Sequence, residues 1–169
     1  EVWWIDSDII LNDDFRNRLE NFSDLSFLVA EEPKFGGYVK QGKRTEGWGF
    51  KVGNLLPFCP NSGVIRACSK HVPLLERWKE LLESDVHRKG QSKPFYKRPL
   101  QMRSDQDVLT SLLESREFSW VSVEFLRRGR DIVQDYCPID YSLKERLTNL
   151  LFGLPPFIHS QGLKPWWAL

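Results

Sequence analysis

Apolar and polar positions along the chain form two kinds of pattern, short apolar runs and runs with helical spacing. A short apolar run bounded by polar or turn residues favours a buried strand. Such runs predict strands over residues 2–5, 26–30, 62–67, 118–123 and 131–134, with a further short strand within 155–159.

Helical spacing is clearest after Ser69 and after Ser104, two residues suited to cap a helix N-terminus. The apolar positions after each cap recur at intervals of three and four residues, which places them on one face. They are Val72, Leu75, Trp78 and Leu82 in the first helix, and Val108, Leu109, Leu112 and Leu113 in the second. Two more helices are expected over 13–22 and 142–151. Strands alternating with helices predict an α/β domain with a mainly parallel or mixed sheet.

Two long segments lack a regular pattern. Residues 31–60 are rich in glycine, and residues 87–103 are basic and contain two prolines. Loops of this length inside a compact domain are usually functional. Within them, we expect residues 36–53 and 89–103 either to bind an acceptor or close over a site, or to be solvated surface loops.

Composition narrows the classes of protein. A chain of 169 residues with 41% hydrophobic residues suits one domain with its own core. The net charge of +1 gives no bulk attraction to nucleic acid, and no apolar run reaches the length of a membrane span. Three cysteines without metal-site spacing favour a reducing, cytoplasmic location. The chain opens inside a strand pattern, so we expect a single domain, 1–169, whose upstream part is missing and whose absent segment could have held a signal or anchor.

Asp6 and Asp8 follow the first apolar run. Ligands of open α/β sheets bind outside the carboxyl ends of the strands. If the strand continues, two carboxylates two residues apart point to one side and can share a divalent cation, which can neutralise a diphosphate leaving group. The same triplet is also compatible with a polar strand end or turn.

Three other polar groups accompany this pair. Asn61 opens an Asn-Ser-Gly stretch at the start of a strand, Asp105 and Gln106 begin a helix, and His159 follows a short apolar run near the chain end. Each also has a structural explanation, as a turn, a favourable helix N-terminus or a buried histidine. Their joint occurrence in this order favours function.

The four groups together resemble glycosyltransferase family 8, a GT-A-type family of nucleotide-sugar transferases. That family shows D-x-D after an apolar strand, N-S/T-G, a D-Q-D helix start and a final H-x-x-G-x-x-K-P-W. The match runs from Asp6 to Trp166 and omits the family's N-terminal nucleobase-binding part. The resemblance implies a Rossmann-like mixed sheet flanked by helices and a retaining transferase that uses Mn²⁺ (or Mg²⁺) and a nucleotide-sugar such as a UDP-sugar. It also implies a carbohydrate, glycan or protein acceptor.

Residue roles are carried over by position. The resemblance implies Asp6, Asp8 and His159 as metal ligands, with Lys164 and the backbone of Gly162 at the diphosphate. It implies Asn61 near the donor sugar, Asp105 at the sugar hydroxyls and Gln106 near the anomeric centre. The tail here reads H-x-x-G-x-K-P-W, one residue shorter than the family pattern, which weakens the placement of Lys164.

Three alternatives stay open. An inverting transferase would use Asp105 or Asp107 as a base. A metal-dependent phosphoesterase or nuclease would use Asp6, Asp8 and His159 and leave the other groups without a role. A non-catalytic carbohydrate-binding remnant of a transferase would retain the fold alone.

Overall fold

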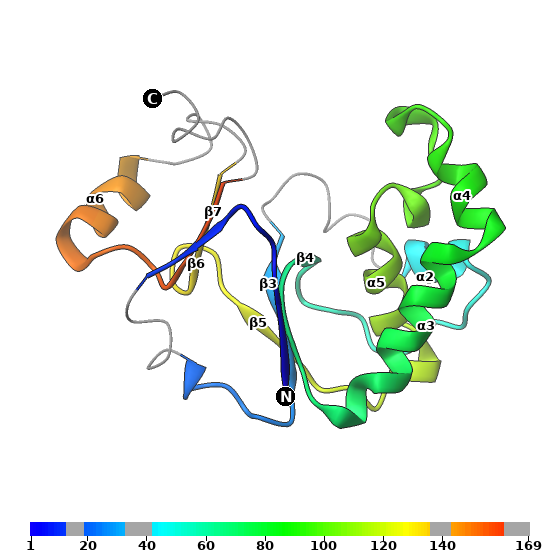
Figure 1. Ribbon diagram of the computed structural model, residues 1–169, viewed down its shortest axis with the longest axis horizontal. Coiled ribbons are helices and arrows are strands. Elements are labelled where there is room, and N and C mark those ends of the chain that lie inside the picture. The colour runs from blue at the N-terminus through cyan, green and yellow to red at the C-terminus, as the bar shows by residue number, and fades with distance from the viewer. Residues whose placement is uncertain (13–18, 33–41, 136–142, 161–169) are drawn as a thin grey trace.

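The computed structural model describes residues 1–12, 19–32, 42–135 and 143–160, which form an α/β fold with two sheets (Figure 1). The larger sheet has four strands in the order β1-β4-β3-β5, with β5 parallel and β1 antiparallel to its neighbour. The smaller has three strands in the order β2-β7-β6. The expected mixed sheet is confirmed, although it is divided into two. The strands are β1 (Val2–Ile5), β2 (Ile9–Leu11), β3 (Phe27–Glu31), β4 (Pro60–Ala67), β5 (Val123–Leu126), β6 (Ile132–Asp135) and β7 (Phe157–Ser160).

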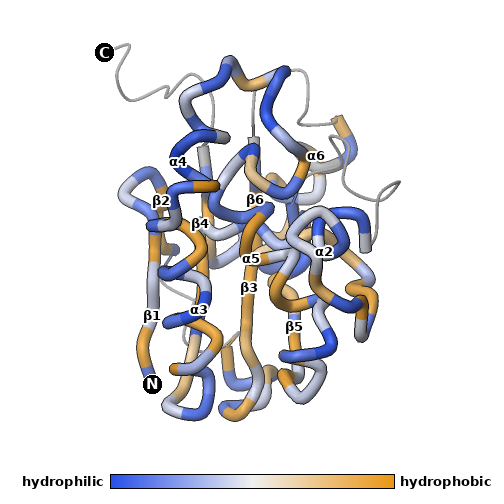
Figure 2. Tube along the Cα trace, turned by 90° about the vertical axis from the view of Figure 1, so that its right-hand side faces the viewer, coloured by the Kyte–Doolittle hydropathy of each residue, from blue (hydrophilic) through white to orange (hydrophobic). Residues whose placement is uncertain are grey.

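Helices α2, α3, α4 and α5 lie on one side of the larger sheet, and the smaller sheet lies on the other (Figure 1). The alternation of side chains along β3 explains this division. Phe27 and Val29 join the core under the helices, whereas Leu28 and Ala30 join a second core that contains Phe157 of β7. Apolar residues therefore run without interruption along β3 from Phe27 to Ala30, as Figure 2 shows. The helices are α2 (Lys43–Gly47), α3 (Val72–Glu83), α4 (Asp85–Gln91), α5 (Asp105–Leu113) and α6 (Leu143–Phe152).

The helix caps match the sequence prediction at one of two places. Ser104 caps α5, because its hydroxyl accepts a hydrogen bond from the Asp107 amide. Ser69 does not cap α3. A short 3₁₀ turn, Ser69–His71, comes first, and the backbone N–H of Cys68 donates to His71 Nδ1 over 3.1 Å. His71 is fully buried, and burial lowers the pKa of its imidazole.

Three other expectations change. Of residues 118–123, only Val123 lies in a strand, because a 3₁₀ turn, Arg116–Phe118, comes first and β5 begins at Val123. The segment 31–60 contains α2, and 87–103 is built from α4 and two short 3₁₀ turns. Strand β2 has only three residues, too few for a pattern to detect. The helix expected over 13–22 falls mainly on residues 13–18, outside the described residues.

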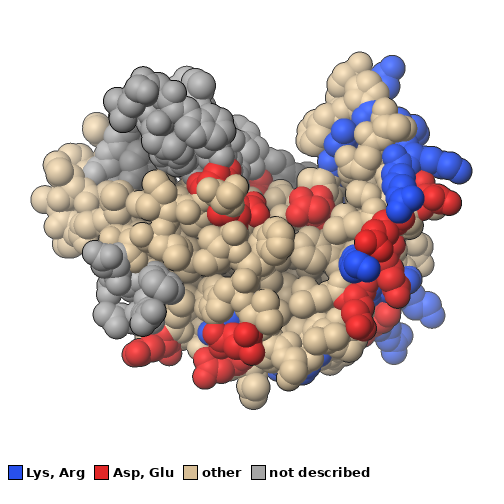
Figure 3. Space-filling model, viewed as in Figure 1, with Lys and Arg blue, Asp and Glu red and all other residues tan. Residues whose placement is uncertain are grey.

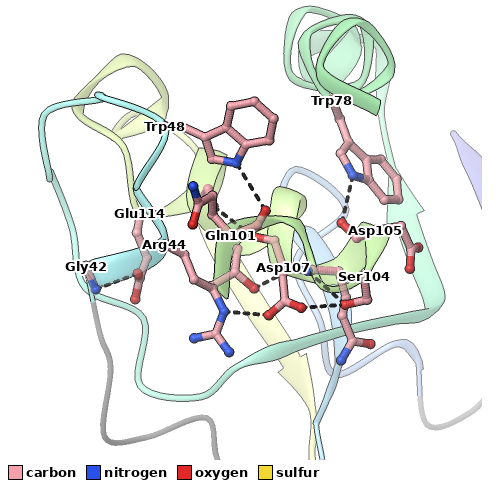
Figure 4. A network of polar contacts seen from close by, with 12 residues as sticks. Gly42, Arg44, Trp48, Trp78, Gln101, Ser104, Asp105, Asp107 and Glu114 are labelled. Carbon is pink, nitrogen blue, oxygen red and sulfur yellow. Dashed lines mark hydrogen bonds and ion pairs between the residues drawn. The ribbon is translucent and has the colours of Figure 1, made fainter. Parts of the chain in front are cut away.

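Helix α2 is held to α5 by buried polar contacts. The carboxylate of Glu114, which is 2% exposed, accepts from the backbone N–H of Gly42 over 2.9 Å and of Leu56 over 3.3 Å. Thr45 donates to the carbonyl of Ser111 over 3.0 Å. Figure 4 shows the bond between Gly42 and Glu114 beside the polar contacts of α5. Glu114 therefore anchors both ends of the segment 42–56.

Among the described residues, no helix is both long and apolar enough to cross a bilayer.

Replacing Glu114 with alanine should lower the free energy of unfolding by about 3 kcal/mol, because two buried N–H groups lose a charged acceptor. Urea denaturation measures this change. The matched control is Glu117→Ala, an exposed carboxylate on the following turn, which should change the stability by no more than about 0.5 kcal/mol. Equal losses in the two variants would show that Glu114 does not anchor the segment.

Candidate functional site

Asp6, Asp8 and His159 meet where the two sheets adjoin. Asp6 follows β1 of the larger sheet, Asp8 precedes β2, and His159 lies in β7. Each offers one ligand atom, and these atoms all lie within 4.8 Å of one another. His159 Nε2 is 3.3 Å from Asp8 Oδ1, and the histidine side chain is only 4% exposed.

These residues converge because the chain turns between Asp6 and Asp8. The sequence pattern suggested instead a strand that continues through both acids. The backbone N–H of Ile9 donates to the carbonyl of Asp6 over 3.1 Å, so the chain reverses between the two acids. Ile9 then pairs with His159 in the smaller sheet, which sets the histidine beside Asp8. Asp6 is fixed from both sides: its amide donates to the Gly63 carbonyl over 2.9 Å, and Trp4 Nε1 donates to its Oδ1 over 2.9 Å.

Carboxylate oxygens suit Mg²⁺ and Mn²⁺, and an imidazole nitrogen suits first-row transition metals, so two carboxylates and one imidazole form a donor set compatible with a divalent cation such as Mn²⁺. The described residues contain this one cluster of three or more potential ligands. Cys59 is not one of its ligands, and burial raises the pKa of the Cys59 thiol.

A bulge in β4 brings the Asn-Ser-Gly stretch to this cluster. Along β3, Val29 pairs with Ile65 but the next residue, Ala30, pairs with Asn61, so β4 has extra residues at this point. Bulges of this kind redirect side chains near functional sites. The extra residues include Gly63, where an added Cβ would stand 2.7 Å from His159 Cε1 and 2.9 Å from Asn61 Oδ1. Only glycine lets β4 approach the histidine ring this closely.

Asn61 connects the cluster to α5. Its Oδ1 accepts from the Gly63 N–H over 2.9 Å, and its Nδ2 donates to Glu32 Oε2 over 2.7 Å and to Gln106 Oε1 over 3.3 Å. The residue is 4% exposed. The buried Asn61 side chain therefore links Gly63 of the β4 bulge to Gln106 at the start of α5.

The two acids of the Asp-Gln-Asp stretch have different surroundings. Asp105 is exposed at the start of α5; its Oδ2 accepts from the Ser62 hydroxyl over 2.7 Å, and its carbonyl accepts from Trp78 Nε1 over 3.0 Å. Asp107 is buried and bound by Arg44 Nε over 2.6 Å and by the hydroxyl of Ser104 over 2.7 Å (Figure 4). Asp105 is therefore available to a ligand, whereas Asp107 is committed to the fold.

The structure brings six of the expected site residues into one connected group: Asp6, Asp8, Asn61, Asp105, Gln106 and His159. Gly162 and Lys164 lie outside the described residues. Sequence reasoning missed Glu32, which bonds Asn61, and the steric need for Gly63. Glu32 comes directly after β3, so the rule that ligands gather at the carboxyl ends of strands could have identified it.

Gly63→Ala should displace the His159 ring, because the new methyl group overlaps it. We expect the affinity for Mn²⁺ to fall at least about tenfold and the stability by about 1–3 kcal/mol. Calorimetric titration with Mn²⁺ and thermal unfolding measure the two effects.

Gly49→Ala is the control for this substitution. Gly49 has a φ of 79° and no atom within 4 Å of an added Cβ, so alanine strains the backbone by about 1 kcal/mol without touching the cluster. It should retain the wild-type affinity for Mn²⁺. An unchanged affinity in Gly63→Ala would contradict the close packing inferred here.

The chain is similar to the protein described as "Probable glycosyltransferase 4" from Oryza sativa subsp. indica, with 25% identity over 138 residues. The protein of the same description from Oryza sativa subsp. japonica matches equally. The match covers 78% of this chain and 26% of each relative, so the chain spans about a quarter of the length of these curated relatives. No family model matches the chain, and no solved structure matches it significantly. The similarity supports a glycosyltransferase-like relationship.

Proposed function

We propose that this chain holds the metal and the donor in a nucleotide-sugar-dependent glycosyltransferase of GT-A type, related to family 8. The donor is a UDP-sugar, and Mn²⁺ or Mg²⁺ is the cofactor. The observation that carries the proposal is the convergence of Asp6, Asp8 and His159 with the bulge of β4 at Asn61–Gly63 and the start of α5. The distant similarity to a plant glycosyltransferase supports the same class of reaction.

Asp6, Asp8 and His159 would hold the cation, which when bound neutralises charge on the diphosphate leaving group. A cation is needed at this site, because the carboxylates of Asp6 and Asp8 would otherwise repel the negatively charged diphosphate of the donor. The fixed turn at Asp6 and the packing of His159 against Gly63 keep the ligands in place before the donor arrives. Lys164 and Gly162 complete the proposal as diphosphate contacts.

The start of α5 would bind the sugar. Asp105 is an exposed carboxylate and accepts hydrogen bonds from sugar hydroxyls, oriented by Ser62 and Trp78. Gln106 presents a neutral amide, which cannot act as a strong nucleophile but can stabilise positive charge at the anomeric carbon through its oxygen. We therefore propose a retaining reaction, in which the acceptor attacks the anomeric carbon from the same face as the departing diphosphate.

Asp8→Asn tests the metal site, because it removes a charged ligand with little change in size. We expect UDP to bind this chain in the presence of Mn²⁺ and not in EDTA, and the variant to lose about tenfold to a hundredfold in affinity. Isothermal titration calorimetry measures both. Asp24→Asn, an exposed carboxylate outside the site, is the control and should bind as wild type. Metal-independent binding, or full affinity in Asp8→Asn, would remove the metal-site assignment.

Gln106→Ala should reduce turnover more than donor affinity if the amide acts on the transition state. The rate of UDP release from a UDP-sugar measures turnover, and the dissociation constant of the same UDP-sugar measures donor affinity. Asn54→Ala, which alters an exposed amide bonded only to the Ser119 carbonyl among the described residues, is the control. Equal losses in turnover and affinity would assign Gln106 to ground-state binding.

A further inference from the structure

A basic projection stands beside the candidate site. It comprises residues 85–103, that is α4 followed by the 3₁₀ turns Phe95–Lys97 and Leu100–Met102. Between residues 86 and 103 there is no acidic residue and there are six cations: Arg88, Lys89, Lys93, Lys97, Arg98 and Arg103. Because the whole chain has a net charge of only +1, the remainder is net acidic. In Figure 3 these positive charges gather on the part that projects above a hollow, and acidic side chains lie beside that hollow.

Internal packing and hydrogen bonds hold the projection in one conformation. Gly90 packs so closely on Met102 that an added Cβ would stand 2.9 Å from its sulfur, and Gln91 Nε2 donates to the carbonyl of the same methionine. Arg98 Nε donates to the carbonyl of Lys93 over 3.0 Å, and its Nη1 donates to that of Arg103 over 3.1 Å. These bonds tie the outgoing and returning halves together, so the projection presents fixed groups to a ligand.

The charges of the projection are not neutralised by the fold. Within the described part of the chain, none of its six cations forms an ion pair, whereas Arg77 and Lys79 on the adjacent α3 each pair with a glutamate. Unpaired cations grouped on one feature create a local positive potential that attracts anions.

Two aromatic side chains are exposed among these cations. Phe95 is 61% exposed and Tyr96 is 74% exposed. The guanidinium groups of Arg98 and Arg103 each lie 5.9 Å from the centre of the Phe95 ring, and Lys97 Nζ lies 5.8 Å from that of Tyr96. Exposed rings offer flat apolar faces, and the neighbouring cations offer hydrogen-bond donors.

The base of the projection is joined to the candidate site. Arg103 immediately precedes Ser104, the cap of α5, and α5 begins with Asp105 and Gln106. Helix α3 fixes the same point, because Trp78 donates to the Asp105 carbonyl. A ligand that lies along the projection therefore ends at the residues proposed to bind the donor sugar.

We propose that the projection binds the acceptor of the transferase, and that this acceptor is an anionic glycan, carrying carboxylate or phosphate groups. This inference rests on the proposed function. The cations pair with the anionic groups, and Tyr96 stacks on a sugar ring. A membrane surface suits the projection less well, because Phe95 lies beside two guanidinium groups that would have to enter the apolar layer with it.

The test compares two defined oligosaccharides, hexagalacturonate and neutral maltohexaose, as ligands of the full chain. Calorimetry should show at least about tenfold tighter binding of hexagalacturonate at low salt, a preference that weakens as added salt screens the charges. The double variant Lys93→Gln/Lys97→Gln should weaken this binding at least about fivefold. The matched control, Lys70→Gln/Lys79→Gln, removes the same charge around the start and middle of α3 and should bind as wild type. Tyr96→Ala should weaken the binding of both oligosaccharides.

Equal affinity for the two oligosaccharides, or equal losses in the two double variants, would overturn the proposal. Binding of the projection to phosphatidylglycerol vesicles without binding to hexagalacturonate would overturn it in favour of a membrane surface. Asp8→Asn separates this inference from the proposed function, since its metal site is not part of the projection. It should keep wild-type affinity for hexagalacturonate while losing Mn²⁺-dependent UDP binding.

Discussion

Strand β4 lies inside the larger sheet and contributes side chains to both hydrophobic cores. All eight of its residues are buried, its two edges pair with β1 and β3, and its two faces contribute to different cores. A strand enclosed on four sides cannot shift register without exposing apolar side chains. The only irregularity is the bulge at its start, and it lies where the candidate site is formed. The site is therefore placed by a strand that is buried along its whole length and paired on both edges.

The acids of the site region divide into two groups by their partners. Asp107 and Glu114 are buried, receive hydrogen bonds from Arg44, Ser104, Gly42 and Leu56, and hold α2 against α5. Asp6, Asp8 and Asp105 are partly or fully exposed: Asp6 accepts from Trp4, Asp105 accepts from Ser62, and Asp8 lies beside His159. Buried carboxylates with full sets of donors stabilise the fold, whereas partly solvated ones can exchange water for a ligand. Carboxylates in this region therefore have two roles: the buried ones stabilise the fold, and the partly exposed ones can bind a ligand.

The sequence predicted the elements that have a clear local pattern. Strand β1, helix α5 with its Ser104 cap and helix α6 follow from apolar runs, capping and helical spacing. The missed elements depend on distant partners: β2 exists because β7 pairs with it, and α2 exists because Glu114 holds it. The strand expected over 118–123 formed later in the sequence, because β5 aligns with β3 through a register that no local pattern encodes.

The candidate site was predicted as a set of residue types in a given order, and its geometry was not. That order placed Asp6, Asp8 and His159 together, but the turn at Asp6, the bulge in β4 and the contact between Gly63 and the histidine ring are tertiary features. Glycine carries no side-chain chemistry, so its necessity at position 63 appears only when the opposing ring is in place. Local sequence patterns cannot report such contacts between segments separated by about a hundred residues.

The pairing of β2 with β7 joins a segment near residue 10 to one near residue 158. Contacts between segments so distant in sequence form late in folding, because the chain between them must be ordered before closure is favourable. During synthesis, Asp6 and Asp8 leave the ribosome long before His159 does. The four-stranded sheet and its helices use residues 2–126 and can form before residue 159 has been synthesised, so the acids remain without their histidine until then. The geometry of the candidate site therefore requires the second sheet, and cannot be complete before that sheet has formed.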